Sequence, residues 1–144
     1  MRKFKMPDLL ANQWVSLWED HTIYEKMKRD GEINSLMTGG SIVHISVDSK
    51  LTSTQAKTLV QDAVKNGMEH FALNCVYSEC RECHKVEKGD FKVCPSCGCE
   101  RLNHFSRVIG YFSLIENWNK TRREHDFPNR KFISKDKIKL ELGE

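Results

Sequence analysis

Four cysteines in two pairs are the residues of this sequence whose types and spacing predict chemistry most clearly. Cys80 and Cys83 form one Cys-x-x-Cys pair, and Cys94 and Cys97 form a second pair after ten intervening residues. Each pair brings two sulfurs to one ion, and two pairs complete a tetrahedral shell of four thiolates, as in structural zinc sites. The pattern predicts a four-cysteine zinc ribbon with no position left for water or substrate. Iron in the same shell remains an alternative.

Other residues near the pairs have simpler interpretations. Cys99 can substitute for Cys97 only through a Cys-x-Cys spacing with poorer geometry, so it is interpreted as a bystander. His84 adjoins the first pair and can replace a ligand, yet four cysteines already suffice. Gly89 and Asp90 lie at the centre of the intervening segment and predict the turn of the ribbon hairpin.

A glycine among large residues, Gly110, follows the cysteine pairs. Read by itself, it indicates a strand kink or a close approach of two backbones.

The segment Arg107-Val108-Ile109-Gly110-Tyr111 resembles the Arg-Val-x-Gly-Tyr signature of the glycyl radical enzymes. Its place after two Cys-x-x-Cys pairs resembles the anaerobic (class III) ribonucleotide reductases in particular. Stretches 35–44, 117–120 and 122–124 are similar to the same family, so the resemblance covers residues 8 to 132. The chain thus resembles the C-terminal glycyl radical domain of an anaerobic ribonucleoside-triphosphate reductase.

The resemblance implies a radical on Gly110, and the chemistry gives a reason for glycine. Glycine alone offers an unhindered Cα with two hydrogens, and a radical formed there by loss of one hydrogen spreads over the two flanking amides. Such a radical needs a buried loop, because dioxygen cleaves the backbone at its site. Val108, Ile109 and Phe112 are therefore expected to shield it, with Tyr111 as part of the same packing.

The resemblance implies an oxidoreductase component of DNA-precursor synthesis in which Gly110 stores the radical and the four cysteines hold structural zinc. A partner radical-SAM activase would use an iron–sulfur cluster and S-adenosylmethionine to form that radical. The radical would then oxidise a cysteine to a thiyl, which abstracts the 3′ hydrogen of a ribonucleotide. That cysteine and the rest of the family's α/β barrel belong to a part of the family chain that this sequence lacks. A larger partner subunit is therefore expected to supply them, and this chain alone is expected not to reduce nucleotides.

Several points stay open on these residues. The substrate is a di- or a triphosphate, and the reductant, the allosteric effectors and the identity of the large partner are undetermined. The chain begins at Met1 with a basic leader. It is a natural split subunit, a replacement part for a radical domain broken by oxygen, or an excised piece of a longer protein.

Two helices are expected before and between the strands that must position these residues. Asp20 is expected to cap a short helix that ends at Gly31. Thr52 and Gln55 have the spacing of a capping box, and the apolar residues after them recur with helical period until Gly67. The second helix is the clearest element of the sequence.

Residues 41–47 and 71–76 are predicted to be buried strands on either side of the second helix. The order strand, helix, strand predicts a βαβ unit with parallel strands, whose open edges need partners that this chain does not supply, or supplies only in its short first segment. His44 and Cys75 lie on these strands and are interpreted as a satisfied polar residue and a small buried side chain.

The predicted fold is α+β: a βαβ unit from the C-terminal part of a glycyl-radical-enzyme α/β barrel, a four-cysteine zinc ribbon, and a radical loop. The expected division is a barrel-completing segment at 1–77, the ribbon at 78–100, and the radical loop with a C-terminal helix at 101–144.

Charge and composition exclude some classes of function. The net charge is +3; four thiolates and one Zn²⁺ contribute −2, which leaves about +1 and gives no support to direct nucleic-acid binding. No apolar run approaches the roughly 20 residues that span a bilayer. Six cysteines without a secretory signal favour metal chemistry in the cytoplasm. The alternative function is a free-standing zinc-ribbon adaptor or nucleic-acid-binding protein, aided by the basic tail at 120–139. A third possible function is that of an inactive regulatory remnant. The basic tail itself is interpreted as solvated surface.

Overall fold

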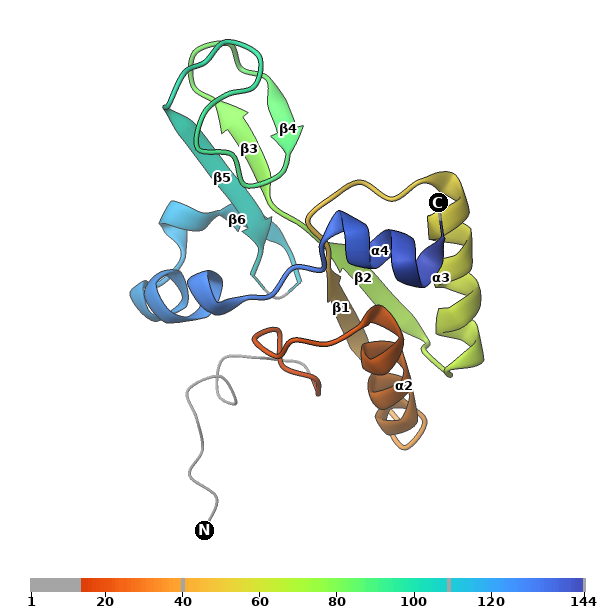
Figure 1. Ribbon diagram of the computed structural model, residues 1–144. Coiled ribbons are helices and arrows are strands. Elements are labelled where there is room, and N and C mark those ends of the chain that lie inside the picture. Colours follow the sequence, from red (N-terminus) through yellow and green to blue (C-terminus); the bar gives the residue numbers. More distant parts are fainter. Residues whose placement is uncertain (1–13, 40, 109, 144) are drawn as a thin grey trace.

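The computed structural model describes residues 14–39, 41–108 and 110–143, and it consists of two parts (Figure 1). Three α-helices pack on one face of a two-stranded parallel sheet, and a narrower four-stranded antiparallel sheet projects from this body. The basic leader lies outside the described residues. The elements follow in this order: α2 (Ile23–Asn34), β1 (Ile42–Ser46), α3 (Ser53–Lys65), β2 (His70–Asn74), β3 (Tyr77–Cys80), β4 (Val86–Lys88), β5 (Leu102–Arg107), β6 (Phe112–Leu114), η1 (Ile115–Asn117), η2 (Arg122–Asp126), η3 (Phe127–Asn129) and α4 (Lys135–Leu142).

The predicted βαβ unit is confirmed. Strands β1 and β2 pair in parallel, with Val43 opposite Phe71, and α3 connects them. Thr52 caps α3 and forms the expected capping box with Gln55. The helix ends just before Gly67, whose φ of +71° is a conformation that glycine adopts without strain. Within the described residues, no helix is both long enough and apolar enough to cross a bilayer.

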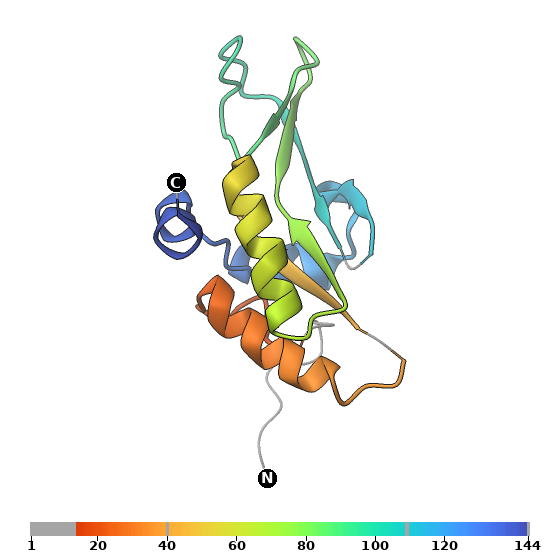
Figure 2. The same ribbon diagram turned by 90° about the vertical axis from the view of Figure 1, so that its right-hand side faces the viewer.

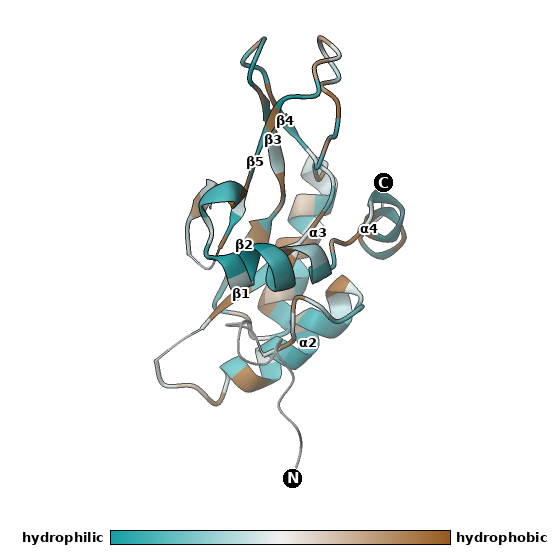
Figure 3. Ribbon diagram, turned by 90° about the vertical axis from the view of Figure 1, so that its left-hand side faces the viewer, coloured by the Kyte–Doolittle hydropathy of each residue, from teal (hydrophilic) through white to brown (hydrophobic). Residues whose placement is uncertain are grey.

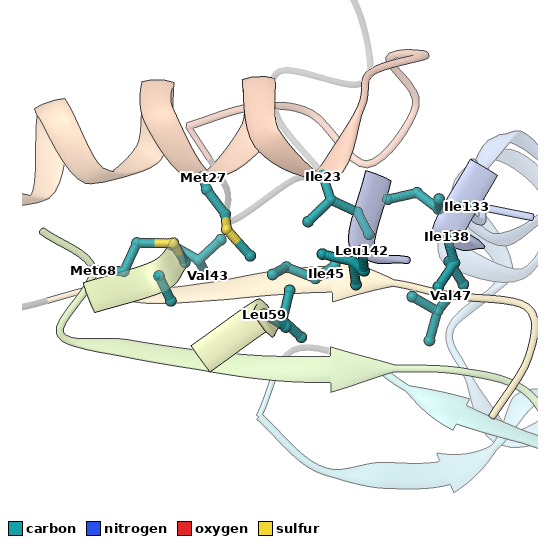
Figure 4. Packing of buried hydrophobic residues seen from close by; sticks show 11 residues of the cluster. Ile23, Met27, Val43, Ile45, Val47, Leu59, Met68, Ile133, Ile138 and Leu142 are labelled. Carbon is teal, nitrogen blue, oxygen red and sulfur yellow. The ribbon is translucent and has the colours of Figure 1, made fainter. Parts of the chain in front are cut away.

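One face of the parallel sheet carries the hydrophobic core. Side chains alternate along a strand, so Val43, Ile45 and Val47 point to the same side of β1. They meet apolar side chains from α2, α3 and α4, which lie on that side (Figures 2 and 4). The buried members of this cluster are Ile23, Met27, Val43, Ile45, Val47, Leu59, Ala63, Met68, Ile133, Ile138 and Leu142.

The opposite face of the parallel sheet is buried but polar. His44 and Ser46 on β1 and Asn74 at the end of β2 are each 3 % exposed or less. The Asn74 amide donates to the Ser46 hydroxyl (3.2 Å), and the Ser106 hydroxyl of β5 donates to the Cys75 carbonyl (3.2 Å). The stem of the β5–β6 hairpin therefore rests on hydrogen-bonding groups rather than on apolar surface.

The chain supplies part of the strand edge that was expected to need an outside partner. Ile133, in the segment before α4, forms a parallel bridge with Val47. Its N–H donates to the Ser46 carbonyl (2.9 Å), and its carbonyl accepts from the Asp48 N–H (3.1 Å). The tail thus crosses back to the end of β1, where it closes the core from that side.

The first predicted helix has different ends. Thr22, not Asp20, caps α2. Its hydroxyl accepts from the Glu25 N–H (3.0 Å), and the Glu25 carboxylate accepts from the Thr22 N–H. Gly31 does not end the helix, which continues to Asn34. A Cβ placed on Gly31 would lie 1.8 Å from the Asn66 carbonyl oxygen, so the glycine lets α2 approach the end of α3.

We expect Gly31→Ala to destabilise the protein, although alanine usually stabilises a helix interior by about 0.5–1 kcal/mol over glycine. The added methyl overlaps backbone, which forces α2 away from α3 at a cost of about 1–3 kcal/mol. Urea unfolding would measure the change. Gly39→Ala is the matched control, because no described atom lies within 4 Å of its Cβ position. A more stable Gly31→Ala chain would contradict the close approach.

Candidate metal centre and glycine hairpin

The four cysteines lie at two turns at one end of the antiparallel sheet. Its strand order is β4-β3-β5-β6, and β3 and β5 pair so that Cys80 lies opposite Leu102. The first Cys-x-x-Cys turn joins β3 to β4, and the second lies in the segment between β4 and β5. Figure 1 shows these turns at the far end of the sheet from the helices.

Both turns have the same backbone hydrogen bonds. In each, the N–H four residues after the first cysteine donates to that cysteine's carbonyl: His84 to Cys80 (3.0 Å) and Gly98 to Cys94 (2.9 Å). Both donors take a left-handed conformation, with φ of +55° at His84 and +73° at Gly98. This geometry turns both sulfurs of a pair toward one point, and it explains the glycine of the second turn.

The four sulfurs converge on one point. The Cys80, Cys83, Cys94 and Cys97 Sγ atoms all lie within 4.8 Å of one another. The closest contacts join the two turns, at 3.5 Å for Cys80–Cys97 and 3.7 Å for Cys83–Cys94. Sulfurs about 2.3 Å from a tetrahedral zinc ion are about 3.8 Å apart, so the group fits such an ion. These four cysteines can hold a metal ion.

Backbone N–H groups favour the thiolate form of the first cysteine of each pair. The backbone N–H of Cys83, assisted by that of Glu82, lowers the pKa of the Cys80 thiol to about 6. The Cys97 and Ser96 N–H groups likewise lower the pKa of Cys94. The Cys99 N–H lowers the pKa of Cys97, but the neighbouring thiols and burial outweigh it and raise that pKa to about 12. Four thiolates this close repel one another, and a divalent cation removes that repulsion.

The hairpin turn of the ribbon differs from the expectation, whereas Cys99 agrees with its interpretation as a bystander. Gly89 and Asp90 do not form the hairpin turn, because the turn between β3 and β4 is the first cysteine turn itself. Gly89 instead follows β4 with φ +139°, where its carbonyl accepts from the Ser78 hydroxyl (2.7 Å). Cys99 lies outside the four-sulfur group, and its sulfur accepts from the Arg101 N–H (3.2 Å).

Gly110 lies in the turn that joins β5 to β6. The last strand pair is Arg107 with Phe112, and the Val108 N–H donates to the Tyr111 carbonyl (3.0 Å). The Arg107 guanidinium donates to the Gly110 carbonyl (2.8 Å), and it also lies 4.9 Å from the centre of the Phe112 ring. The predicted strand kink is therefore a hairpin turn (Figure 1).

The expected shield around Gly110 is not formed by this chain's described residues. Gly110 is exposed, Tyr111 is 64 % exposed and Phe112 is 41 % exposed, whereas Val108 is half-buried. Ile109 lies outside the described residues. No described atom lies within 4 Å of an added Cβ. Packing among the described residues therefore does not require a glycine here.

Arg130 is a functional candidate that the sequence did not reveal, since the basic tail was interpreted as solvated surface. The ribbon of η2, just before it in the chain, is mostly hydrophilic (Figure 3) and most of its residues are exposed, but the Arg130 side chain itself is 1 % exposed. It donates to the Arg107 carbonyl (2.7 Å) and the Val108 carbonyl (3.2 Å) at the base of the glycine turn. Burial, together with the charges of Arg107 and Arg130, lowers the pKa of nearby His44 to about 4.

Cys75 is buried at the junction of the two sheets, as predicted, and it is 4 % exposed. A hydrogen bond with Cys75 raises the pKa of Tyr77, whose ring meets Phe112 edge to face at 5.6 Å. The Cys75 sulfur lies outside the four-sulfur group.

Comparisons with known proteins agree on one family. A family model described as anaerobic ribonucleoside-triphosphate reductase matches residues 9–132. No curated protein sequence gives a significant match. A solved anaerobic ribonucleotide reductase is similar with a TM-score of 0.72 and 28 % identity, over 86 % of this chain and 20 % of that one. The anaerobic ribonucleotide reductase from Thermotoga maritima in complex with dATP and CTP gives 0.61 and 29 %, over 79 % and 18 %. This chain spans about one fifth of the length of these structures.

Proposed function

The chain belongs to the anaerobic ribonucleoside-triphosphate reductase family, and from this membership we propose that it is the component that stores a glycyl radical on Gly110. The family relation gives the chain an oxidoreductase role. The match includes the glycine hairpin as well as the cysteine ribbon, whereas a zinc-ribbon adaptor would need only the ribbon.

The observation that carries this proposal is the character of the Gly110 position. The residue ends the run Arg107-Val108-Ile109-Gly110 at an exposed turn, where no described atom lies close enough to exclude a side chain. Glycine is the one residue whose Cα can lose a hydrogen and leave an unhindered planar radical, so the chemistry accounts for a glycine that packing does not require. The exposed Cα is also open to an enzyme that removes that hydrogen.

The proposed chemistry begins with transfers of single hydrogen atoms. An activase of the radical-SAM class takes a hydrogen atom from the Gly110 Cα and leaves the unpaired electron there. In the assembled reductase, Gly110 takes a hydrogen atom back from a cysteine thiol of the larger subunit, and the resulting thiyl abstracts the 3′ hydrogen of the ribonucleotide. The 2′ hydroxyl then leaves as water, an external reductant supplies two electrons and two protons, and the thiol returns its hydrogen atom to C3′, which gives the deoxyribonucleotide and regenerates the thiyl.

A larger catalytic subunit is the proposed partner, because this chain lacks what a stored radical needs. Tyr111 and Phe112 beside Gly110 are exposed, so protection from dioxygen must come from outside the described residues. The chain also spans about one fifth of the similar structures. We propose that the partner's barrel covers the hairpin and supplies the thiyl cysteine and the nucleotide site, in the cytoplasm and under anaerobic conditions.

We propose zinc as the ion of the four-sulfur group, with a structural role. The thiolates fill all four positions of a tetrahedral shell, so the ion offers no place for substrate. The ion would cross-link the two cysteine turns near the last residue of β3 and the first residue of β5.

The experiment that tests the proposal is anaerobic electron paramagnetic resonance on the chain, co-expressed with its candidate barrel partner and a radical-SAM activase. A doublet is expected, because the one remaining Cα hydrogen splits the signal. Glycine deuterated at Cα should collapse that doublet. Absence of any signal, with full metal content and an activase that cleaves S-adenosylmethionine, would overturn the proposal.

A further inference from the structure

We propose that Arg130, paired with Asp126, is a positioning residue for Gly110, because its buried guanidinium holds the stem of the glycine hairpin in one place. The proposal rests on the proposed radical role of Gly110, and it adds a residue of the tail to that site. Hydrogen-atom transfer requires the two reacting atoms to meet in a narrow range of geometry, so the hairpin must return to one position between transfers.

All three nitrogens of the Arg130 guanidinium are used. Nη1 donates to the Arg107 carbonyl (2.7 Å), and Nη2 donates to the Val108 carbonyl (3.2 Å). Nε and Nη2 donate to the two carboxylate oxygens of Asp126 at 3.0 and 2.7 Å. The planar fork of arginine suits this double recognition, and lysine cannot reproduce it.

The Asp126 carboxylate accepts hydrogen bonds from three side chains, one of which is the Arg130 guanidinium. It is 3 % exposed on its side chain, and it accepts from the Trp18 indole (3.2 Å) and from Arg122 (3.0 Å) as well as from Arg130. Burial by itself would raise the pKa of Asp126, but the bonds and charge of Arg130, with Trp18 and Arg122, outweigh burial and lower it. The carboxylate is therefore ionised near neutral pH and fixes the arginine.

Arg130 also reaches the second strand of the hairpin. Its guanidinium lies 4.9 Å from the centre of the Trp118 ring, and the Trp118 indole donates to the Ser113 hydroxyl of β6 (2.8 Å). Both strands at the base of the turn are thus held from the tail. The tip has fewer contacts, with Arg107 donating to the Gly110 carbonyl.

The position of Gly110 therefore follows from two arginines in series. Arg130 fixes the backbone of Arg107, and the Arg107 side chain then fixes the Gly110 carbonyl, which is one of the two groups over which the radical spreads. Loss of Arg130 leaves the Arg107 and Val108 carbonyls without this charged donor, while the strands of the ribbon keep their pairing.

The test compares the wild-type chain with the double variant Arg130→Met/Asp126→Asn, which removes both charges together. Arg130→Met alone would leave an unpaired buried carboxylate and can fail to fold. Amide hydrogen exchange of residues 107–112 is expected to accelerate by about tenfold to 100-fold, as for loss of bonds to a charged group. The radical yield per chain, measured by paramagnetic resonance with the barrel partner and activase, is expected to fall by about tenfold or more.

Arg123→Met is the matched control, because Arg123 is an exposed arginine of the same segment that donates to the Glu116 carbonyl (2.8 Å). It should change neither measurement. Arg130→Lys keeps the charge opposite Asp126 and should recover part of the yield, which a loss of folding alone would not allow. Unchanged exchange in a folded, metal-loaded double variant would overturn the proposal, and so would faster exchange with an unchanged yield. A wild-type chain that gives no doublet would instead overturn the radical role of Gly110.

Discussion

Gly110→Ala is expected to leave the fold and the metal content unchanged and to abolish the radical signal completely. An added methyl meets no described atom within 4 Å, so stability should stay within about 0.5 kcal/mol of wild type. The chemistry should fail, because alanine has a single Cα hydrogen and its methyl both hinders the abstracting group and twists the flanking amides. Paramagnetic resonance on matched anaerobic samples measures the signal.

A control variant separates a loss of the radical from a loss of the fold. Gly39→Ala serves as the control, because that position is also free of described neighbours and is far along the chain from the hairpin. It should give the full doublet. A doublet of wild-type size in Gly110→Ala would place the radical on another residue, whereas a Gly110→Ala chain that unfolds would show that packing requires the glycine after all.

Removal of the metal is expected to disorder the ribbon while the hydrophobic core of the helices stays folded. The ribbon has a small apolar cluster of its own, built around Cys80, Cys94 and Leu102, and this cluster is separate from the main core. Structural zinc binding contributes about 10–16 kcal/mol in small zinc domains at pH 7, which so few apolar contacts cannot replace. Trypsin should then cut the chelated chain at Lys85, Lys88 and Lys92, and leave the loaded chain intact there.

Serine variants identify the ligands. Cys97→Ser is the sharpest, because Cys97 is exposed and serine disturbs no core packing at that position. Its metal affinity, measured by competition with a chromophoric chelator, should fall by at least about 100-fold. Substitution of residues that only hydrogen-bond to metal ligands already lowers affinity by about 10–100-fold, and loss of a ligand should cost more. Cys99→Ser is the control and should keep one ion per chain. Wild-type affinity in Cys97→Ser would rule out the four-sulfur assignment.

Features that depend on neighbours in the sequence could be predicted from it. The capping box of Thr52 and Gln55 is a set of bonds across one turn, so its spacing is visible in the residues themselves. The parallel pairing of β1 and β2 follows from the order strand, helix, strand. The convergence of four sulfurs follows from two short turns, each of which fixes its own pair.

Features that depend on distant parts of the chain could not be predicted in this way. Gly31 has the sequence context of a helix end, yet its role is set by the Asn66 carbonyl of another helix. Arg130 stands in a basic run that has the composition of a solvated surface. Its partners include carbonyls 22 and 23 residues earlier in the chain, and the composition around Arg130 does not indicate these contacts.

The glycine hairpin combines both cases. The order Arg107 to Tyr111 indicates the residue that we propose to store the radical, because that chemistry demands glycine. The loop was expected to be buried, whereas the described turn is exposed. Cover by the proposed partner would lie outside this chain, so the order of these residues does not indicate it.

Strand β5 pairs with β3 beside the metal turns at its first residue, Leu102, and with β6 beside the glycine turn at its last, Arg107. Six residues of extended chain measure about 20 Å, which is beyond the distance at which exposed charges act on one another in physiological salt. The charge of a metal ion in the four-sulfur group is therefore screened at Gly110, and such an ion would act on the glycine through the geometry of β5. If Gly110 stores the proposed radical, the same doublet is expected whether zinc or iron fills the four-sulfur shell.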